Sequence, residues 1–347
     1  MPNEKKPKTK CVEYLRHAEY YDMQSTFDEL YARSQAGEIF ENLMDVILSR
    51  ENILLAYRNI KSNTGSITPG TDKLEISDIG KLTADEVTAR VRKIVKGAKN
   101  GYTPRSVRRK DIPKPNGNTR PLGIPCIWDR LVQQCIKQVM EPICEARFSN
   151  NSYGFRPNRS VENAIAAIYR LMQKSGLHYV VEFDIKGFFD HLSHEWMMEF
   201  LKLYIKDPNL LWLINKYLKA GVMTDGVFEE SEEGSAQGNI ISPILANIYM
   251  HNVLTLWYKF VIRSNTVGNS FLTVYADDFI AGFQYKEDAE RYYVLLKERL
   301  KKFNLELEES KSRMIEFGRY AEANSKRKYG KKPETFDFLG FTFYCGK

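Results

Sequence analysis

One segment, Phe271 to Phe283, is almost wholly apolar except for two adjacent aspartates, Asp277 and Asp278, near its middle. The flanking residues are rich in β-branched and aromatic side chains, which predicts two strands joined by a tight turn. Aspartate is common in turns, so a purely structural role is one reading. Two neighbouring carboxylates beside apolar strands repel each other, however, and this is costly unless a cation neutralises them. We therefore expect the turn to bind a cation.

A third carboxylate, Asp184, ends another apolar strand that begins at Tyr179. By itself it is an ordinary strand-end residue. Three carboxylates on two neighbouring strands can supply the hard oxygen ligands that hold two Mg²⁺ ions roughly 4 Å apart. In two-metal phosphoryl transfer, one ion activates the attacking 3′-hydroxyl and the other stabilises the leaving pyrophosphate. The pattern predicts a nucleotidyl-transfer site at Asp184, Asp277 and Asp278, with two Mg²⁺ ions or Mn²⁺ in their place.

The remainder of the chain mixes helical and strand patterns. Helical periodicity marks residues 43–57, 84–99, 131–143, 161–172, 240–260 and 287–303, and strand-like runs mark residues 107–125, 312–317 and 336–344. The run at 107–125 predicts a basic β-ribbon with its turn at Pro115-Asn116-Gly117. With 347 residues and 43% hydrophobic content, the chain can bury a large core in two or three subdomains. We expect an α+β fold.

The formal net charge of +7 is spread unevenly along the chain. Residues 90–120 hold 11 Lys or Arg and one acid, and residues 326–332 form a second basic block, whereas residues 225–233 are acidic. A basic block can be a solvated face or can bind phosphates, and composition does not separate the two.

The location of the protein is indicated by its cysteines and by its apolar runs. None of the five cysteines has CxxC spacing, which predicts free thiols in a reducing compartment. The first ten residues are charged and lead into polar sequence without the apolar core of a signal peptide, and no run of 18 apolar residues occurs. We expect a cytoplasmic protein without a membrane partner.

Two boxes around the aspartates carry a family resemblance. Tyr275-Ala-Asp-Asp278 resembles the YxDD box of reverse transcriptases, and Phe183-Asp-Ile-Lys-Gly-Phe-Phe-Asp190 resembles their first catalytic motif. Further boxes resemble those of group II intron-encoded reverse transcriptases, in the family's order, at residues 63–72, 112–125, 152–159, 242–247 and 338–341. The YxDD box alone would be a weak match, but the ordered set spans about residues 45–345 and is specific.

The resemblance implies a right-hand polymerase fold, with an antiparallel palm sheet covered by helices. It implies a helical extension at 1–60, fingers at 61–176 that include the basic ribbon, and a palm at 177–347 interleaved with fingers-like helices. Full family members continue into a helical thumb after the last palm block. The sequence stops at Lys347, so we expect the thumb to be absent and synthesis by this chain to be weakly processive.

The resemblance also implies roles in nucleotide binding. Lys114 and Arg120 on the ribbon would grip the incoming triphosphate. Gln237 and Gly238 would line the nucleotide pocket. Phe189 would be a steric gate, occupying the space of a ribose 2′-hydroxyl and so favouring dNTPs. Each role has a plainer alternative, since basic residues solubilise turns and a phenylalanine fits a core.

Two further expectations concern the metal and the pocket. The backbone carbonyl of Ile185 would join the three aspartates as a metal ligand. The stretch Ser235-Ala-Gln-Gly-Asn239 stands where the family usually has Pro-Gln-Gly-Gly. The Gln and the first Gly are kept, but Ala236 and Asn239 put the shape of the pocket in doubt.

RNA contacts are expected from the fingers and from the loop at 152–159, because in the family the N-terminal extension and fingers bind intron RNA. The loop could instead be purely structural. The residues expected to bind RNA are Arg105, Arg108, Arg109, Lys110, Arg156 and Arg159.

The resemblance favours RNA-directed DNA synthesis by a group II intron-encoded protein that also binds its intron RNA and assists splicing. Its partners would be intron RNA or an RNA template, a DNA or RNA primer, and dNTPs, and a homodimer is one arrangement. One alternative is a reverse transcriptase of another bacterial system, such as a retron, a diversity-generating element or a CRISPR-associated system. Another is a catalytically idle RNA scaffold, against which the three intact aspartates argue.

Overall fold

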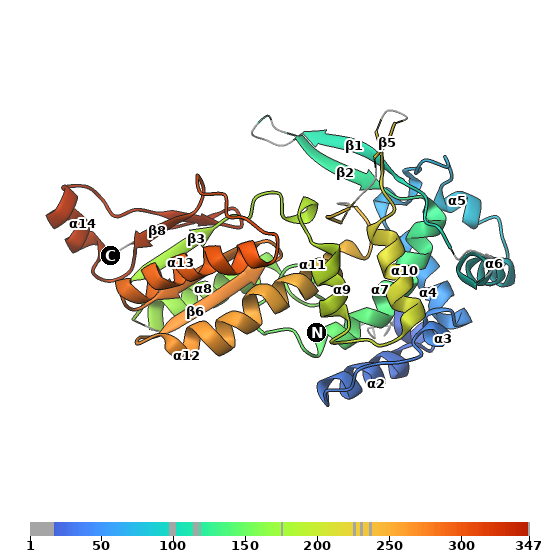
Figure 1. Ribbon diagram of the computed structural model, residues 1–347, viewed down its shortest axis with the longest axis horizontal. Coiled ribbons are helices and arrows are strands. Elements are labelled where there is room, and N and C mark those ends of the chain that lie inside the picture. The colour runs from blue at the N-terminus through green and yellow to red at the C-terminus, as the bar shows by residue number, and fades with distance from the viewer. Residues whose placement is uncertain are drawn as a thin grey trace, which may run out of the picture.

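The computed structural model describes residues 17–96, 102–113, 117, 119–174, 176–224, 227–229, 232–235 and 238–345. The molecule is elongated, with most of the N-terminal helices at one end and a strand-rich region at the other (Figure 1). No helix within these residues is both long and apolar enough to span a membrane. Helices and antiparallel sheets occur together, as the α+β prediction requires.

The first end of the molecule is built around one helix, α7, Ile127–Glu145, which is buried along most of its length. Its apolar side chains recur at helical spacing on several faces, so it packs against α2 and α4 rather than against solvent. Buried polar groups on α7 find partners. Gln138 Nε2 donates to the Asn52 carbonyl at 2.7 Å, and Asn52 Nδ2 donates to the Cys135 carbonyl at 3.1 Å.

Shorter helices surround α7, and several begin at capping residues that the sequence supplies. The Ser49 side chain accepts from Asn52 N at the start of α4, and Asp207 accepts from Asn209 N at the start of α10. These surrounding elements are α1 His17–Tyr20, α2 Gln24–Gln35, α3 Met44–Ile47, α4 Arg50–Lys61, η1 Thr64–Ile67, α5 Ile76–Ile79, α6 Ala84–Lys96, α9 His194–Leu201 and α10 Pro208–Leu218.

A four-stranded sheet of order β2-β1-β4-β5 lies above α7 (Figure 1). Strands β1, Val107–Pro113, and β2, Thr119–Ile124, are antiparallel partners, so the predicted ribbon is confirmed. The sheet is extended by β4, Val222–Thr224, and β5, Val227–Glu229, which the sequence analysis did not predict. Because β4 pairs only with Val107 and Arg108 of β1, the rest of β1 and β2 extends beyond it. Pro115 and Asn116 of the predicted turn lie outside the described residues.

A second four-stranded sheet has the order β6-β7-β3-β8, and all three pairings are antiparallel. We call it the palm sheet after the region that the family resemblance predicts here. Its strands are β3 Tyr179–Phe183, β6 Ser270–Tyr275, β7 Asp278–Phe283 and β8 Arg313–Glu316. Side chains alternate between two covered faces. Phe183 meets Tyr292 of α13, Lys286–Lys302, with ring centroids 5.7 Å apart, while Ile280 packs with Ile168 of α8, Val161–Lys174. Burial on both faces explains why these strands read as continuous apolar runs.

The remaining elements join the two regions and complete the far end. A helical rod comprises α11 Ser242–Met250, the π-helical segments η3 His251–Thr255 and η4 Tyr258–Ile262, and α12 Arg263–Asn265. It confirms the helix predicted at 240–260. The far end carries α14 Ala321–Tyr329, which was not predicted, and a hairpin of β9 Phe336–Phe338 and β10 Phe341–Phe343.

Candidate active site

The palm sheet places two of the predicted aspartates together at one end of its central strands, β3 and β7. We call this end of the sheet the candidate catalytic edge. The β3–β7 pairing ends with Phe183 opposite Phe279. Asp184 follows Phe183 and Asp278 precedes Phe279, so the two aspartates occupy adjoining positions on neighbouring antiparallel strands. Residues opposite each other across such a pair project from the same face. The sequence prediction that these strands are neighbours is confirmed.

The third aspartate, Asp277, lies in the hairpin turn between β6 and β7. Tyr275 pairs with Asp278, so the turn itself consists of Ala276 and Asp277. Ala276 has a φ of 57°, which places a residue with a Cβ in the left-handed region that glycine favours. Such strain persists only where the surroundings hold the backbone in place.

A loop at residues 149–159 packs against this turn and against the end of β6. Val274 N donates to the Asn151 carbonyl, and Tyr153 N donates to the Val274 carbonyl, both at 2.9 Å. A Cβ added to Gly154 would lie 2.4 Å from the backbone nitrogen of Ala276. Because only glycine permits this approach, the Ser152–Arg159 box has a structural reason to contain it.

Lys311 contacts the candidate catalytic carboxylates from the segment before β8. Its Nζ lies 2.5 Å from Asp184 Oδ2. The hydrogen bond to Asp184 raises the pKa of Lys311 above its usual value, and the charge of Asp278 adds to the effect. The ammonium group of Lys311 therefore lies where the sequence predicts a metal ion.

The backbone of Ile185 also faces this edge. Glu308 N donates to the Asp184 carbonyl at 2.8 Å, and Lys186 N donates to the Glu306 carbonyl at 2.9 Å. Alternate residues of an extended strand direct their N–H and C=O groups to opposite sides. The carbonyl of Ile185 therefore points away from residues 306–308, toward the side on which β7 lies.

The donor set suits a hard divalent cation in kind, since it consists of carboxylates and a backbone carbonyl. Among the described residues, however, no three His, Cys, Asp or Glu side chains are grouped closely enough to hold a metal ion. Asp184 instead directs an oxygen to Lys311. The backbones of Asp184 and Asp278 adjoin each other, and the carboxylates would have to turn toward a shared ion in order to hold it.

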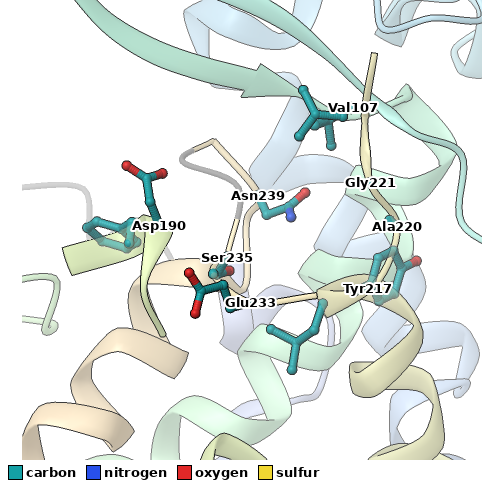
Figure 2. Close-up of a pocket in the computed structure, with 12 residues that line it drawn as sticks. Val107, Asp190, Tyr217, Ala220, Gly221, Glu233, Ser235 and Asn239 are labelled. Atoms are coloured by element: carbon teal, nitrogen blue, oxygen red, sulfur yellow. The ribbon is translucent and has the colours of Figure 1, made fainter. Parts of the chain in front are cut away.

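A hollow of about 120 Å³ lies between β1 and the short helix η2, Phe188–Asp190, which follows Asp184 in the sequence. Phe189 lines it and is half-buried rather than enclosed in the core. Figure 2 shows Asn239 in the middle of this hollow, with Val107 above it and Ser235 below. Ser235 N donates to the Phe189 carbonyl at 2.8 Å, which ties the two walls together.

The loop after Ser235 touches the ribbon. Gly238 has a φ of 121°, and a Cβ on it would lie 2.1 Å from the Gly123 carbonyl oxygen of β2. Asn239 is buried, and its Oδ1 accepts from Gln133 Nε2 at 3.1 Å. Lys114, Ala236 and Gln237 lie outside the described residues, as does the side chain of Arg120.

The expected RNA-binding residues of β1 and its approach divide into two kinds. Arg105, Arg109 and Lys110 are exposed, and Arg109 forms a long ion pair of 3.5 Å with Asp111. Arg108 instead donates through Nε and Nη2 to the Pro69 carbonyl, at 3.1 and 2.8 Å. Arg108 therefore fastens the preceding loop to the ribbon.

The structure argues against the expected RNA contact of Arg156. Its side chain is 2% exposed, and Nε and Nη2 donate to the two carboxylate oxygens of Glu145 at 2.7 and 2.6 Å. Nη1 donates to the Ser152 carbonyl at 2.7 Å. Arg159 is also engaged, because Nη1 donates to the Asn150 carbonyl at 2.8 Å. Both arginines stabilise the loop that packs against the candidate catalytic turn.

Sequence reasoning missed Lys311 and Gln133. Lys311 is 127 positions from Asp184 and Gln133 is 106 positions from Asn239, so no local spacing connects either pair. The only signal was the departure from the family at Asn239, which indicated that something else must accommodate its side chain.

Comparison with known proteins gives a consistent picture. The chain matches the family described as reverse transcriptase (RNA-dependent DNA polymerase) over residues 112–343. It is 37% identical over 235 residues to the group II intron-encoded protein LtrA of Lactococcus lactis subsp. cremoris, covering 66% of this chain and 38% of LtrA. It is 36% identical over 214 residues to protein YkfC of Escherichia coli (strain K12), covering 61% of this chain and 55% of YkfC.

The match thus spans about half or less of the length of these two relatives. Among solved structures, an apo telomerase from Candida tropicalis truncated from its C-terminal domain superposes with a TM-score of 0.50 at 15% identity, covering 78% of this chain and 59% of that chain. This likeness concerns the fold alone. Because the family match covers residues 112–343, well over half of the sequence, the chain belongs to the reverse transcriptase family.

Proposed function

We propose that this protein is an RNA-directed DNA polymerase encoded by a group II intron, and that it also binds intron RNA and assists splicing. The observation that carries the polymerase proposal is the placement of Asp184 and Asp278 on adjoining strands, with Asp277 in the turn between β6 and β7. Family membership supports the reaction class, and the similarity to LtrA supports the intron assignment.

Asp184, Asp277, Asp278 and the Ile185 carbonyl would hold two Mg²⁺ ions, or Mn²⁺ in their place. Bound there, such ions would lower the pKa of a primer 3′-hydroxyl and neutralise the charge of the leaving pyrophosphate. The strained turn at Ala276 and the loop packed against it would fix the backbone that carries Asp277 and Asp278, so that only side-chain rotation is needed to bring the carboxylates to the ions.

Nucleotide binding is assigned to the groove between the ribbon and the palm. Phe189 would sit beside the sugar and exclude a 2′-hydroxyl. Its place five residues after Asp184 and its half-buried position in the wall of the hollow support this role. Lys114 and Arg120 would bind the triphosphate, and Gln237 with Gly238 would line the pocket. The close approach of Gly238 to Gly123 supports this, since it brings the pocket loop against the ribbon.

The decisive experiment is primer extension on poly(rA)/oligo(dT) with Mg²⁺. We expect the double variant Asp277→Ala, Asp278→Ala to lose about 10³-fold or more in rate, because removing metal ligands forfeits several kcal/mol of charge stabilisation. The matched control is Glu290→Ala, Glu298→Ala, which removes two exposed acids of α13 and should keep the wild-type rate.

Two outcomes would point elsewhere. A wild-type chain that binds RNA tightly but extends no primer supports the idle-scaffold alternative. An active chain that binds a structured group II intron RNA no better than an unrelated RNA of equal length supports a reverse transcriptase of another bacterial system instead.

A further inference from the structure

A second basic surface lies far from the fingers. The segment 319–332, here called the basic arm, contains α14 and the turn after it, and it holds six Lys or Arg residues and one acid, Glu322. All six cations are exposed. Of these six, Lys328 forms an ion pair with Glu316 at 3.1 Å. The arm thus concentrates positive charge that the neighbouring acids do not balance.

The arm is held in a defined shape. Ala321 is buried at its base, and Gly330 ends α14 in the left-handed conformation. The Ser325 hydroxyl donates to the carbonyls of Lys331 and Lys332, at 3.0 and 3.2 Å. This folds the last two lysines back beside the helix. The cations are therefore preorganised as a cluster, which lowers the entropy cost of binding a polyanion.

The position of the arm separates it from the other candidate RNA surface. In Figure 1, α14 lies at the extreme end of the molecule, whereas β1 and β2 rise from the region of α7 and extend over its middle. The basic arm and the ribbon are therefore separate surfaces.

Exposed aromatic rings accompany the charge. Tyr329 is 71% exposed at the end of α14. Arg319 of the arm also lines a hollow of about 840 Å³, together with the exposed rings of Tyr169, Phe341 and Tyr344. Large exposed apolar groups gathered beside cations mark a binding surface more often than a solvated face.

We propose that the basic arm is a second RNA-binding surface, where phosphates of a single-stranded RNA segment contact the cations and an unpaired base stacks on Tyr329. Cations alone would suit an acidic protein equally well. The flat, exposed tyrosine between them favours a nucleic acid, because every base presents a face for stacking. The proposal extends the RNA binding of the proposed function but does not depend on polymerase chemistry.

The test measures binding of a fluorescent 20-nucleotide oligo(A) to the whole chain over a range of KCl concentrations. The variant Lys326→Gln, Arg327→Gln, Lys331→Gln, Lys332→Gln should bind about tenfold or more weakly, and its slope of log affinity against log salt should fall by about 2 to 3. The control Lys202→Gln, Lys206→Gln, Lys286→Gln, Lys302→Gln removes the same charge from exposed lysines elsewhere and should retain most of the slope.

Stacking is tested separately at Tyr329. Tyr329→Leu should weaken oligo(A) binding about fivefold or more, whereas Tyr329→Phe should bind like the wild type. Equal losses in the arm variant and the control, or unchanged binding in both Tyr329 variants, would overturn the proposal. So would an arm variant that keeps its affinity for oligo(A) but loses it for poly-aspartate, which indicates an acidic protein partner. Failure of the wild-type chain to extend a primer would overturn only the proposed function.

Discussion

At the scale of single residues, the contact between Lys311 and Asp184 sets two cations in competition. Lys311 Nζ forms an ion pair with Asp184 Oδ2, an oxygen that the proposed function assigns to a metal. A divalent ion must displace the ammonium before it can use this oxygen. The side chain of Lys311 is 67% exposed, and exposed ion pairs contribute only about 0.2 to 1 kcal/mol. The competition is therefore modest and measurable.

Replacing Lys311 by the uncharged, similarly shaped methionine should tighten metal binding. We expect Lys311→Met to lower the Kd for Mn²⁺ about two- to fivefold in the absence of nucleic acid and nucleotide, because the ion no longer displaces an ammonium. Electron paramagnetic resonance of free Mn²⁺ measures this directly. Lys297→Met is the control, since Lys297 pairs with Glu309 at 2.7 Å and its loss changes the net charge equally. Weaker Mn²⁺ binding by Lys311→Met would show that the lysine supports the metal instead.

At the scale of elements, Gln133 of α7 binds the loop that contains the predicted pocket residues Gln237 and Gly238, here called the pocket loop. Its Nε2 donates to Asn239 Oδ1 at 3.1 Å, and its Oε1 accepts from Ile240 N at 2.7 Å. All of these groups lie at or near the buried junction between α7 and α11. The asparagine that departs from the family pattern therefore has a specific partner, and the departure is accommodated rather than disruptive.

This pair should show strong coupling. Gln133→Leu leaves the Asn239 amide and the Ile240 N–H without their partner, so we expect the free energy of unfolding to fall by about 2 kcal/mol. Asn239→Gly, which restores the residue usual in the family, should recover part of this loss when added to Gln133→Leu. Urea denaturation of the four proteins gives the coupling energy. Simple additivity of the two single effects would contradict the assignment.

Elements whose pattern lies within one short segment of the sequence could be predicted. Elements that depend on pairing with residues far away in the sequence could not. Strands β3, β6 and β7 have long apolar runs, and the β6–β7 turn lies within one segment, so the edge that joins Asp184 to Asp278 could be foreseen. The three-residue strands β4 and β5 are too short to show a pattern of their own, and β4 joins its sheet through the pairing of Val222 with Val107, far away in the sequence. Likewise, nothing in the sequence around Arg156 and Arg159 distinguishes an arginine that forms a buried ion pair from one that contacts RNA.

At the scale of the whole molecule, the loop at 149–159 connects the two ends. Arg156 anchors it to α7 through Glu145, and Asn247 Nδ2 of α11 donates to the Gly154 carbonyl at 2.9 Å. The same loop pairs with β6 and packs against the candidate catalytic turn. The central helix of one region is thereby linked to the candidate catalytic edge of the other by a chain of direct contacts.

Removing Arg156 should therefore affect stability rather than RNA binding. The Glu145 side chain is only 21% exposed, so Arg156→Gln leaves a largely buried carboxylate with only its longer, 3.8 Å ion pair to Arg159, and we expect a loss of about 3 kcal/mol in the free energy of unfolding. Thermal and urea denaturation measure this loss, and oligo(A) binding at low temperature should match the wild type. Arg109→Gln, on the exposed face of the ribbon, should show the reverse, with unchanged stability and weaker binding. If Arg156→Gln were as stable as the wild type but bound RNA poorly, the direct RNA contact expected from the sequence would be restored, and the loop would belong to the RNA-binding surface.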